Sequence, residues 1–198
     1  MVSTRFADRF RSRFSGIGRV VAKTNLSPNA ITVIGLFLNA AVAAIIASGN
    51  LLLGGALLLI AGAFDVVDGA VARATGQVSR FGSFFDSTID RYADAVILGG
   101  LLLYFLDEDA GTWPVLLTFI AVVGSLMISY TRSKAEGLGL RGDVGFAQRA
   151  ERVIILSAGL MLGYPEWAVG ILAVLTQLTV LQRIIHVWRE LQRGDSER

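Results

Sequence analysis

The sequence predicts an all-α integral membrane protein with six transmembrane helices and an amphipathic interfacial helix at the N-terminus. Of the 198 residues, 54% are hydrophobic and only 17% are charged, whereas an ordinary soluble domain has about 25% charged residues. Long apolar runs alternate with short polar breaks, as in helices that cross a bilayer. The basic residues form four clusters and leave three long stretches without Lys or Arg, at 27–49, 92–131 and 153–182.

Residues 3–22 are expected to form an amphipathic helix within a cytoplasmic segment, 1–25, that precedes a membrane domain, 26–198. Apolar residues recur there every three or four positions, which places them on one helical face. They are Phe6, Phe10, Phe14, Ile17 and Val21. Arginines run beside this stripe and suit an anionic leaflet. No apolar run follows until Ile31, which argues against a secretory signal.

Six apolar runs follow this segment, and the fifth is the shortest. The predicted spans are 30–48, 52–73, 84–106, 113–133, 149–164 and 167–189. The breaks after the first, third and fifth spans carry no Lys or Arg, so the basic residues gather at the other connections and the termini. The positive-inside rule makes that side cytoplasmic. We therefore expect a multi-pass protein of the cell membrane with both termini in the cytoplasm.

Four aspartates interrupt the second and third spans. Asp65 and Asp68 are spaced i, i+3, and Asp86 and Asp90 are spaced i, i+4, so each pair lies on one helical face near the cytoplasmic end. The turn between the two spans is short, which predicts antiparallel neighbours with the carboxylates at similar depth. An ionised carboxylate in a span costs roughly 2.5–3.5 kcal/mol, so we expect a compensating cation.

The chain has no cysteine and one histidine, so a metal site must use oxygen ligands, which favour Mg²⁺, Mn²⁺ or Ca²⁺. Gly69 leaves room for a ligand, and Arg73 one turn later offers a fork for a phosphate. The spacing alone leaves three readings open: a catalytic metal centre, a proton or ion pathway, and structural pairing with arginines.

The complete pattern, D-x-x-D-G-x-x-A-R-x8-G-x3-D-x3-D, resembles the signature of the CDP-alcohol phosphotransferase family. It matches at Asp65, Asp68, Gly69, Ala72, Arg73, Gly82, Asp86 and Asp90. The resemblance implies an enzyme that transfers a phosphatidyl group from CDP-diacylglycerol to a polar alcohol and releases CMP. It implies that the four aspartates hold two Mg²⁺ ions, with Mn²⁺ as a substitute, and that Asp90 is the general base. It also implies a homodimer in the lipid bilayer, with no nucleic-acid partner.

By the same resemblance, the cytidine nucleotide lies against Gly69, Arg73 and Ser79. The segment before the first span adds Asn29 and Thr32 as expected contacts, although a Ser-Pro-Asn turn before a helix also explains that segment. Two further titratable residues lie outside the signature. Asp94 is expected to pair with Arg91 or a neighbouring helix rather than with the metal. His186 is expected near the cytoplasmic end of its helix without a ligand role.

The acceptor must be read from other residues. Lys134, Arg152 and Arg183 come from three helices at their cytoplasmic ends, and together they would suit an acceptor that carries a phosphate. The positive-inside bias also explains basic residues at these places. The tract from Gly137 to Arg152 resembles the branch that makes phosphatidylinositol phosphate from inositol phosphate, and this favours inositol 1-phosphate as the acceptor.

Two alternatives remain. Phosphatidylglycerol phosphate synthase is the rival within the family, because glycerol 3-phosphate also needs a phosphate pocket. An ion-coupled transporter could use the same carboxylates, but it is expected to place polar residues at the midplane of several spans, often in repeated halves. Here the charges collect at one membrane face and no repeat is seen, which disfavours transport.

Overall fold

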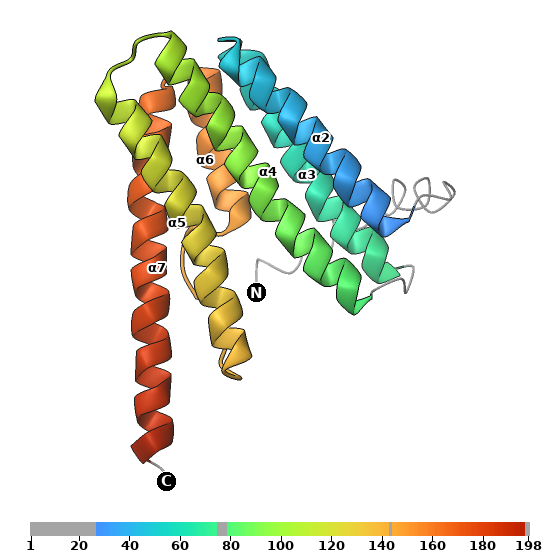
Figure 1. Ribbon diagram of the computed structural model, residues 1–198, viewed down its shortest axis with the longest axis vertical. Helices are drawn as coiled ribbons and strands as arrows, with labels where there is room; N and C mark the ends of the chain where they lie inside the picture. The colour runs from blue at the N-terminus through green and yellow to red at the C-terminus, as the bar shows by residue number, and fades with distance from the viewer. Residues whose placement is uncertain (1–26, 75–78, 143, 197–198) are drawn as a thin grey trace, which may run out of the picture.

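The structure is a computed structural model that describes residues 27–74, 79–142 and 144–196, and for 28, 63–74 and 194–196 it describes the backbone alone. All regular secondary structure in these ranges is helical (Figure 1). The helices are α2 (Pro28–Ala47), α3 (Leu51–Ala74), α4 (Arg80–Asp107), α5 (Thr112–Gly137), α6 (Arg149–Leu162) and α7 (Pro165–Ser196). Each coincides with one predicted apolar run. The amphipathic helix expected over 3–22 lies outside the described residues.

Local sequence explains where several helices begin and end. Ser27 caps α2 by accepting a hydrogen bond from the backbone N–H of Ala30 at 3.3 Å, and Pro28 occupies the first turn, where no N–H is needed. Ser79 caps α4 in the same way through Gly82. The helix α6 ends at Gly163, whose φ of 76° is favourable for glycine. The helix α7 continues past its apolar run because neither proline nor glycine interrupts residues 182–193.

The six described helices form a closed ring. Each packs against two neighbours, in the order α2, α4, α5, α7, α6, α3 and back to α2. Among the described residues, no Cα of α4 lies within 8 Å of a Cα of α6, so these two helices are not neighbours in the ring. Ile46, Leu101, Phe105, Leu160 and Val169 are almost completely buried and belong to one apolar core.

Small residues allow close approach at several of these contacts. A Cβ on Gly100 would lie 2.4 Å from the carbonyl oxygen of Ala43, so α4 and α2 meet backbone to backbone there. A Cβ on Gly62 would lie 2.8 Å from the Cγ1 of Val153, where α3 meets α6. These glycines therefore serve packing within the chain, as small residues do in membrane helices.

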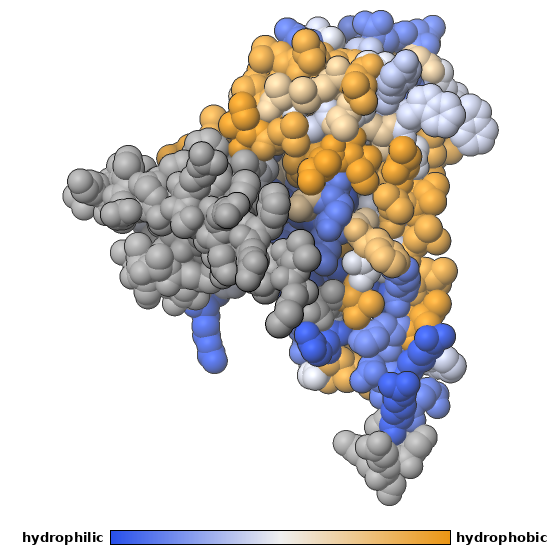
Figure 2. All heavy atoms as spheres, turned by 180° about the vertical axis from the view of Figure 1, so that it is seen from behind, coloured by the Kyte–Doolittle hydropathy of each residue, from blue (hydrophilic) through white to orange (hydrophobic). Residues whose placement is uncertain are grey.

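Within the described residues, three helices are long and apolar enough to cross a membrane: Asn29–Ala47, Thr112–Gly137 and Pro165–Arg193. The stretch Leu51–Gly62 of α3 is also apolar. Large apolar side chains such as Phe37, Phe119 and Trp167 are exposed, and hydrophobic residues cover much of the surface between the two ends of the molecule (Figure 2). The helical class is confirmed, and its apolar surface is typical of a membrane protein. Six spans stay a prediction, because α4 carries most of its charged residues along its first half and α6 has only 14 residues.

Candidate active site

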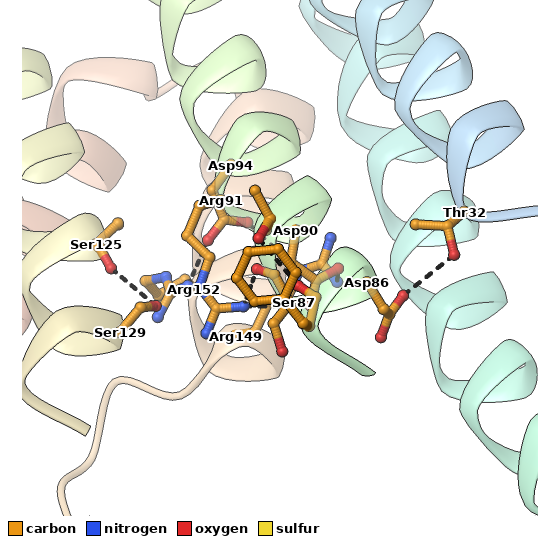
Figure 3. Close-up of polar contacts among 12 residues, drawn as sticks. Thr32, Asp86, Ser87, Asp90, Arg91, Asp94, Ser125, Ser129, Arg149 and Arg152 are labelled. Carbon is orange, nitrogen blue, oxygen red and sulfur yellow. Dashed lines mark hydrogen bonds and ion pairs between the residues drawn. The ribbon is translucent and has the colours of Figure 1, made fainter. Parts of the chain in front are cut away.

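Three carboxylates follow one another at intervals of one turn along α4. Asp86, Asp90 and Asp94 are spaced i, i+4 and i+8, but they meet different partners (Figure 3). Asp86 faces α2, where the hydroxyl of Thr32 lies 3.4 Å from its Oδ1. Asp90 and Asp94 instead face two arginines of α6. An α-helix has about 3.6 residues per turn, so each step of four residues rotates the side chain a little further around the helix axis. Asp86 therefore points towards α2, whereas Asp90 and Asp94 point towards α6.

The arginine pair of α6 matches the carboxylate pair of α4. Arg149 donates from Nη1 to Oδ1 of Asp90 at 2.6 Å, and its Nε lies 3.4 Å from Oδ1 of Asp94. Arg152 donates from Nη2 to Oδ2 of Asp94 at 2.5 Å. Spacings of i, i+3 and i, i+4 place each pair on one helical face. Arg149 therefore bridges both carboxylates, and Asp94 binds both arginines.

These ion pairs reach across the interior of the ring. The helices α4 and α6 do not touch through their backbones, so long arginine side chains are needed to span the gap. The side chains are shielded from solvent: relative exposure is 10% for Arg152, 19% for Asp94 and 26% for Arg149. At such sites, paired charges interact more strongly than exposed ones do. The four groups form one network, which we call the Asp-Arg network.

A small cavity begins at the Asp-Arg network. It has a volume of about 40 Å³ and is lined by residues of all six described helices, including Asp94, Arg149 and Arg152 at its polar end. Asn39 of α2 and Ser125 of α5 add polar groups to the lining, and the remainder is apolar. Asn39 is buried and donates to the carbonyl of Gly35. The centre of the ring is therefore polar at the end that holds Asp90 and apolar beyond it.

The predicted nucleotide contacts of α2 and α4 lie near the signature residues. Thr32 is beside Asp86, and Oδ1 of Asn29 would be 3.5 Å from a Cβ on Gly82, the second glycine of the signature. Ser79 accepts the hydrogen bond that caps α4, which gives it a structural role and leaves its O–H as a donor. The helices α2 and α4 run parallel, so their N-terminal ends meet and bring these three positions together.

The first half of the signature lies on the last three turns of α3. Its backbone is helical through Asp65, Asp68, Gly69 and Arg73, but these side chains lie outside the described residues. Among the side chains that are described, no three acidic or imidazole groups gather into a metal site. Asp86 and Asp90 offer hard oxygen donors on one stretch of α4, which suits Mg²⁺ or Mn²⁺. They would supply half of the predicted ligand set.

The three predicted acceptor residues are not equivalent. Lys134 is exposed in the last turn of α5. Arg183, on α7, is only 4% exposed and donates from Nε to the carbonyl of Val144 at 2.7 Å and from Nη1 to the carbonyl of Ile128. Arg152 donates from Nη1 to the carbonyl of Ala147 at 2.9 Å.

Arg152 and Arg183 therefore both donate hydrogen bonds to backbone carbonyls of the segment 138–148, which connects α5 to α6. The hydroxyl of Thr179 on α7 also accepts from the backbone N–H of Ala147 at 3.2 Å, which adds a third anchor. The structure thus brings Arg152 and Arg183 to the same segment. Their role toward an acceptor stays a prediction.

Arg149 is the residue of this site that the sequence reasoning did not single out. Its signal was the match between R-A-E-R in α6 and D-R-Y-A-D in α4, two pairs of opposite charge with helical spacing. Asp94 pairs with another helix, as expected, although that helix is α6, which lies across the ring rather than beside α4. Arg91 lies 3.8 Å from Asp90 and also donates to the carbonyl of Ser87, on its own helix. His186 is partly buried on α7.

Comparison with known proteins identifies the family. The chain matches the CDP-alcohol phosphatidyltransferase family over residues 25–187, and it belongs to that family. The chain is therefore an enzyme of this class, as the signature predicted.

Individual relatives agree with this assignment. The archaetidylinositol phosphate synthase of Methanothermobacter thermautotrophicus is 41% identical over 183 residues, which cover 89% of this chain and 90% of that protein. The crystal structure of Mycobacterium tuberculosis phosphatidylinositol phosphate synthase with CDP-DAG bound is similar with a TM-score of 0.82 at 33% identity, covering 88% of this chain and 93% of that chain. The same enzyme in complex with manganese and citrate has a TM-score of 0.80 at 33% identity, covering 88% of both chains.

Proposed function

We propose that this enzyme transfers a phosphatidyl group from CDP-diacylglycerol to the hydroxyl of inositol 1-phosphate, giving phosphatidylinositol phosphate and CMP. The observation that carries the proposal is the Asp-Arg network, which places the signature carboxylate Asp90 and its neighbour Asp94 beside shielded guanidinium groups at one end of the ring. The carboxylates suit a metal-bound diphosphate, and the arginines suit an acceptor that carries its own phosphate. Relatives named for archaetidylinositol phosphate and phosphatidylinositol phosphate support the inositol phosphate acceptor.

In the proposed reaction, Asp90 accepts the proton of the acceptor hydroxyl. The resulting oxygen attacks the lipid-side phosphorus of the diphosphate, a new P–O bond forms, and the P–O bond to CMP breaks. CMP leaves with the bonding electron pair. Asp90 is suited to this role because Arg149 fixes its Oδ1 at 2.6 Å and so orients the carboxylate. A positioned base of this kind contributes typically 10²–10⁴-fold to a rate.

We propose that Asp65, Asp68, Asp86 and Asp90 hold two divalent cations, with Mg²⁺ as the resident ion and Mn²⁺ as a substitute. Such ions neutralise charge that develops on the diphosphate and hold it in line with the attacking oxygen. The hard oxygen donors of Asp86 and Asp90 on α4 support this assignment, as does a relative crystallised with manganese. Chelation with EDTA should abolish transfer, and Mg²⁺ should restore it.

The CDP-lipid is proposed to bind against Asn29, Thr32, Gly69, Arg73 and Ser79. Support comes from Thr32 and Asn29, which lie beside the signature residues Asp86 and Gly82. The acceptor phosphate is proposed to bind Lys134, Arg152 and Arg183. Support comes from the shared segment that Arg152 and Arg183 hold and from the position of Arg152 one turn after Arg149.

We further propose that all six helices cross the cell membrane, with the termini and the active site on the cytoplasmic side, and that the enzyme is a homodimer. The apolar helices support the membrane assignment, and the basic clusters at one face support the orientation. Two single-cysteine variants, Arg193→Cys and Glu108→Cys, both at exposed positions, would test the orientation by labelling with a thiol reagent. Labelling of the first from the cytoplasm and of the second from the outside is expected.

The decisive experiment supplies the purified protein with CDP-diacylglycerol, Mg²⁺ and one acceptor at a time. The acceptors are inositol 1-phosphate, glycerol 3-phosphate, free inositol and serine, and CMP release is measured. Transfer to inositol 1-phosphate is expected. Preferred use of glycerol 3-phosphate would instead identify a phosphatidylglycerol phosphate synthase. If none of these acceptors supports CMP release, the acceptor assignment is overturned. CDP-archaeol in a parallel set distinguishes an ether-lipid donor.

Asp90→Asn provides the matched test of the base. This variant should lose transfer while it still binds the CDP-lipid, since an amide retains the shape of the side chain but accepts a proton poorly. Glu136→Gln, on the exposed end of α5, makes the same chemical change away from the site. Wild-type turnover in Asp90→Asn would remove Asp90 from this role.

A further inference from the structure

We propose that Asp94 is a positioning residue, which holds the guanidinium groups of Arg149 and Arg152 so that the acceptor phosphate binds with its hydroxyl facing Asp90. This inference rests on the proposed function and adds a residue outside the signature to it. Asp94 contacts both arginines: its Oδ2 is 2.5 Å from Arg152 and its Oδ1 is 3.4 Å from Arg149.

The position of the network argues for a role in the site rather than in helix packing. The helices α4 and α6 are not neighbours in the ring, so these ion pairs do not reinforce a direct contact between two packed helices. They extend into the central cavity, where Asp94, Arg149 and Arg152 form the polar end (Figure 3). A buried or half-buried ion pair is weak support for stability, because desolvation offsets much of the attraction. Its main effect is to fix where the charged groups point.

The charge balance explains why Asp94 is needed. Two carboxylates, Asp90 and Asp94, face two arginines across the ring. Without Asp94, the shielded guanidinium of Arg152 would lose its carboxylate partner. The next carboxylate on the same face of α4 is Asp90. Both guanidinium groups would then compete for Asp90. The base would be engaged by two cations, and the phosphate site would lose its geometry.

Arg152 also retains the donors that a phosphate requires. A guanidinium has five N–H donors, and its two named bonds go from Nη2 to Asp94 and from Nη1 to the carbonyl of Ala147. These bonds hold the planar group at two corners. A group held in this way can meet a phosphate with little further loss of rotational freedom, which is how preorganisation raises affinity. Asp94 thus acts on the acceptor through Arg152.

The test compares Asp94→Asn with the control Glu136→Gln, which removes a carboxylate from the exposed Arg132–Glu136 pair at 2.8 Å. For Asp94→Asn, the KM for the acceptor should rise about tenfold or more, as expected for loss of a charge-assisted hydrogen bond. The KM for the CDP-lipid should change less than about twofold. Asp94→Glu keeps the charge but moves the carboxylate, and its acceptor KM should fall between those of the wild type and Asp94→Asn. Glu136→Gln should leave both constants unchanged.

A double-mutant cycle separates positioning from direct contact. If Asp94 acts through the arginines, the double variant Asp94→Asn/Arg152→Ala should raise the acceptor KM by clearly less than the product of the two single effects. Additive effects would mean that Asp94 contacts the acceptor itself. A lower thermal midpoint with both KM values unchanged would mean a structural tether, and either result overturns the proposal. Should Asp94→Asn fail to fold, a wild-type acceptor KM in Asp94→Glu overturns it as well.

The acceptor panel distinguishes failure of this inference from failure of the proposed function. If the wild type prefers glycerol 3-phosphate, the inositol assignment is wrong, and the Asp94 variants are measured with that acceptor instead. If the wild type uses only an alcohol without a phosphate, both proposals are overturned. If inositol 1-phosphate is used and Asp94→Asn retains its KM, the inference alone is overturned.

Discussion

Arg149 and Asp90 come from helices whose backbones do not touch, yet Nη1 of Arg149 lies 2.6 Å from Oδ1 of Asp90. The last aspartate of the signature is therefore held from across the ring by a residue outside the signature. A carboxylate fixed in this way keeps one orientation relative to Asp86 on its own helix. The site thus depends on α6 as much as on the two helices that carry the signature.

Replacing Arg149 with alanine should lower kcat by about tenfold to a hundredfold, because Asp90 loses a charge-assisted hydrogen bond and can leave its present orientation. The measurement is CMP release at saturating CDP-lipid and acceptor. Arg132→Ala is the control, since Arg132 makes an ion pair of similar length, 2.8 Å, in which both side chains are 52% exposed. Exposed pairs contribute about 0–1 kcal/mol. Wild-type kcat in Arg149→Ala would contradict this prediction.

Replacing Thr32 with valine should raise the KM for the CDP-lipid several-fold. Valine keeps the shape of threonine but removes the hydroxyl that lies 3.4 Å from Oδ1 of Asp86, at the place proposed for the nucleotide. The several-fold rise in KM follows from the loss of one hydrogen bond, which contributes about 0.5–1.5 kcal/mol. Thr131→Val is the matched control, because the Thr131 hydroxyl donates to carbonyls of its own helix. Equal effects of the two substitutions would show that Thr32 has no special role.

Replacing Arg183 with lysine should destabilise the protein and loosen the segment 138–148. The buried guanidinium donates from two nitrogens to the carbonyls of Val144 and Ile128, whereas a lysine ammonium lacks the planar fork. Leaving a buried acceptor unsatisfied costs about 1–3 kcal/mol, or roughly 2–4 °C per kcal/mol in a chain of this size. Thermal unfolding and limited proteolysis in detergent would measure both effects.

Arg193→Lys serves as the control for that experiment. Arg193 is exposed, and its ion pair, at 3.5 Å, is with Glu190 on the same helix rather than with the connecting segment. Its thermal midpoint and its cleavage pattern should match the wild type. If Arg183→Lys also matches the wild type in both measurements, the buried hydrogen bonds do not anchor the segment.

The helices could be predicted from the sequence because apolar runs and polar breaks determine where a membrane helix can begin and end. Ser27 and Ser79 mark two helix starts by their capping side chains. The end of α7 was less predictable: its apolar run stops at about residue 189, but the helix continues to Ser196. Loss of hydrophobicity ends a membrane span without ending the hydrogen-bonded helix.

The candidate site was predictable where its residues share a helix and less so where they come from different ones. The spacing of Asp86 and Asp90 is visible in the sequence, and so is the pairing expected of Asp94. The partnership of Asp90 with Arg149 depends on which helices face each other across the ring, and this is set by packing between distant segments. Arg183 shows the same limit, since its bonds to Val144 and Ile128 require the contact of α7 with α5 and the following segment.

Gly100→Ala should destabilise the enzyme by about 1–3 kcal/mol, the usual cost of overpacking. The new Cβ would lie 2.4 Å from the carbonyl oxygen of Ala43, and a backbone atom of α2 cannot yield without moving the helix. Since α2 also carries Thr32 to Asp86, we expect a higher KM for the CDP-lipid as well. Gly99→Ala is the matched control, because nothing lies within 4 Å of its Cβ position, and the gain in helix propensity should stabilise it by about 0.5–1 kcal/mol. Opposite shifts of the thermal midpoint in the two variants would support close α2–α4 packing, and equal shifts would contradict it.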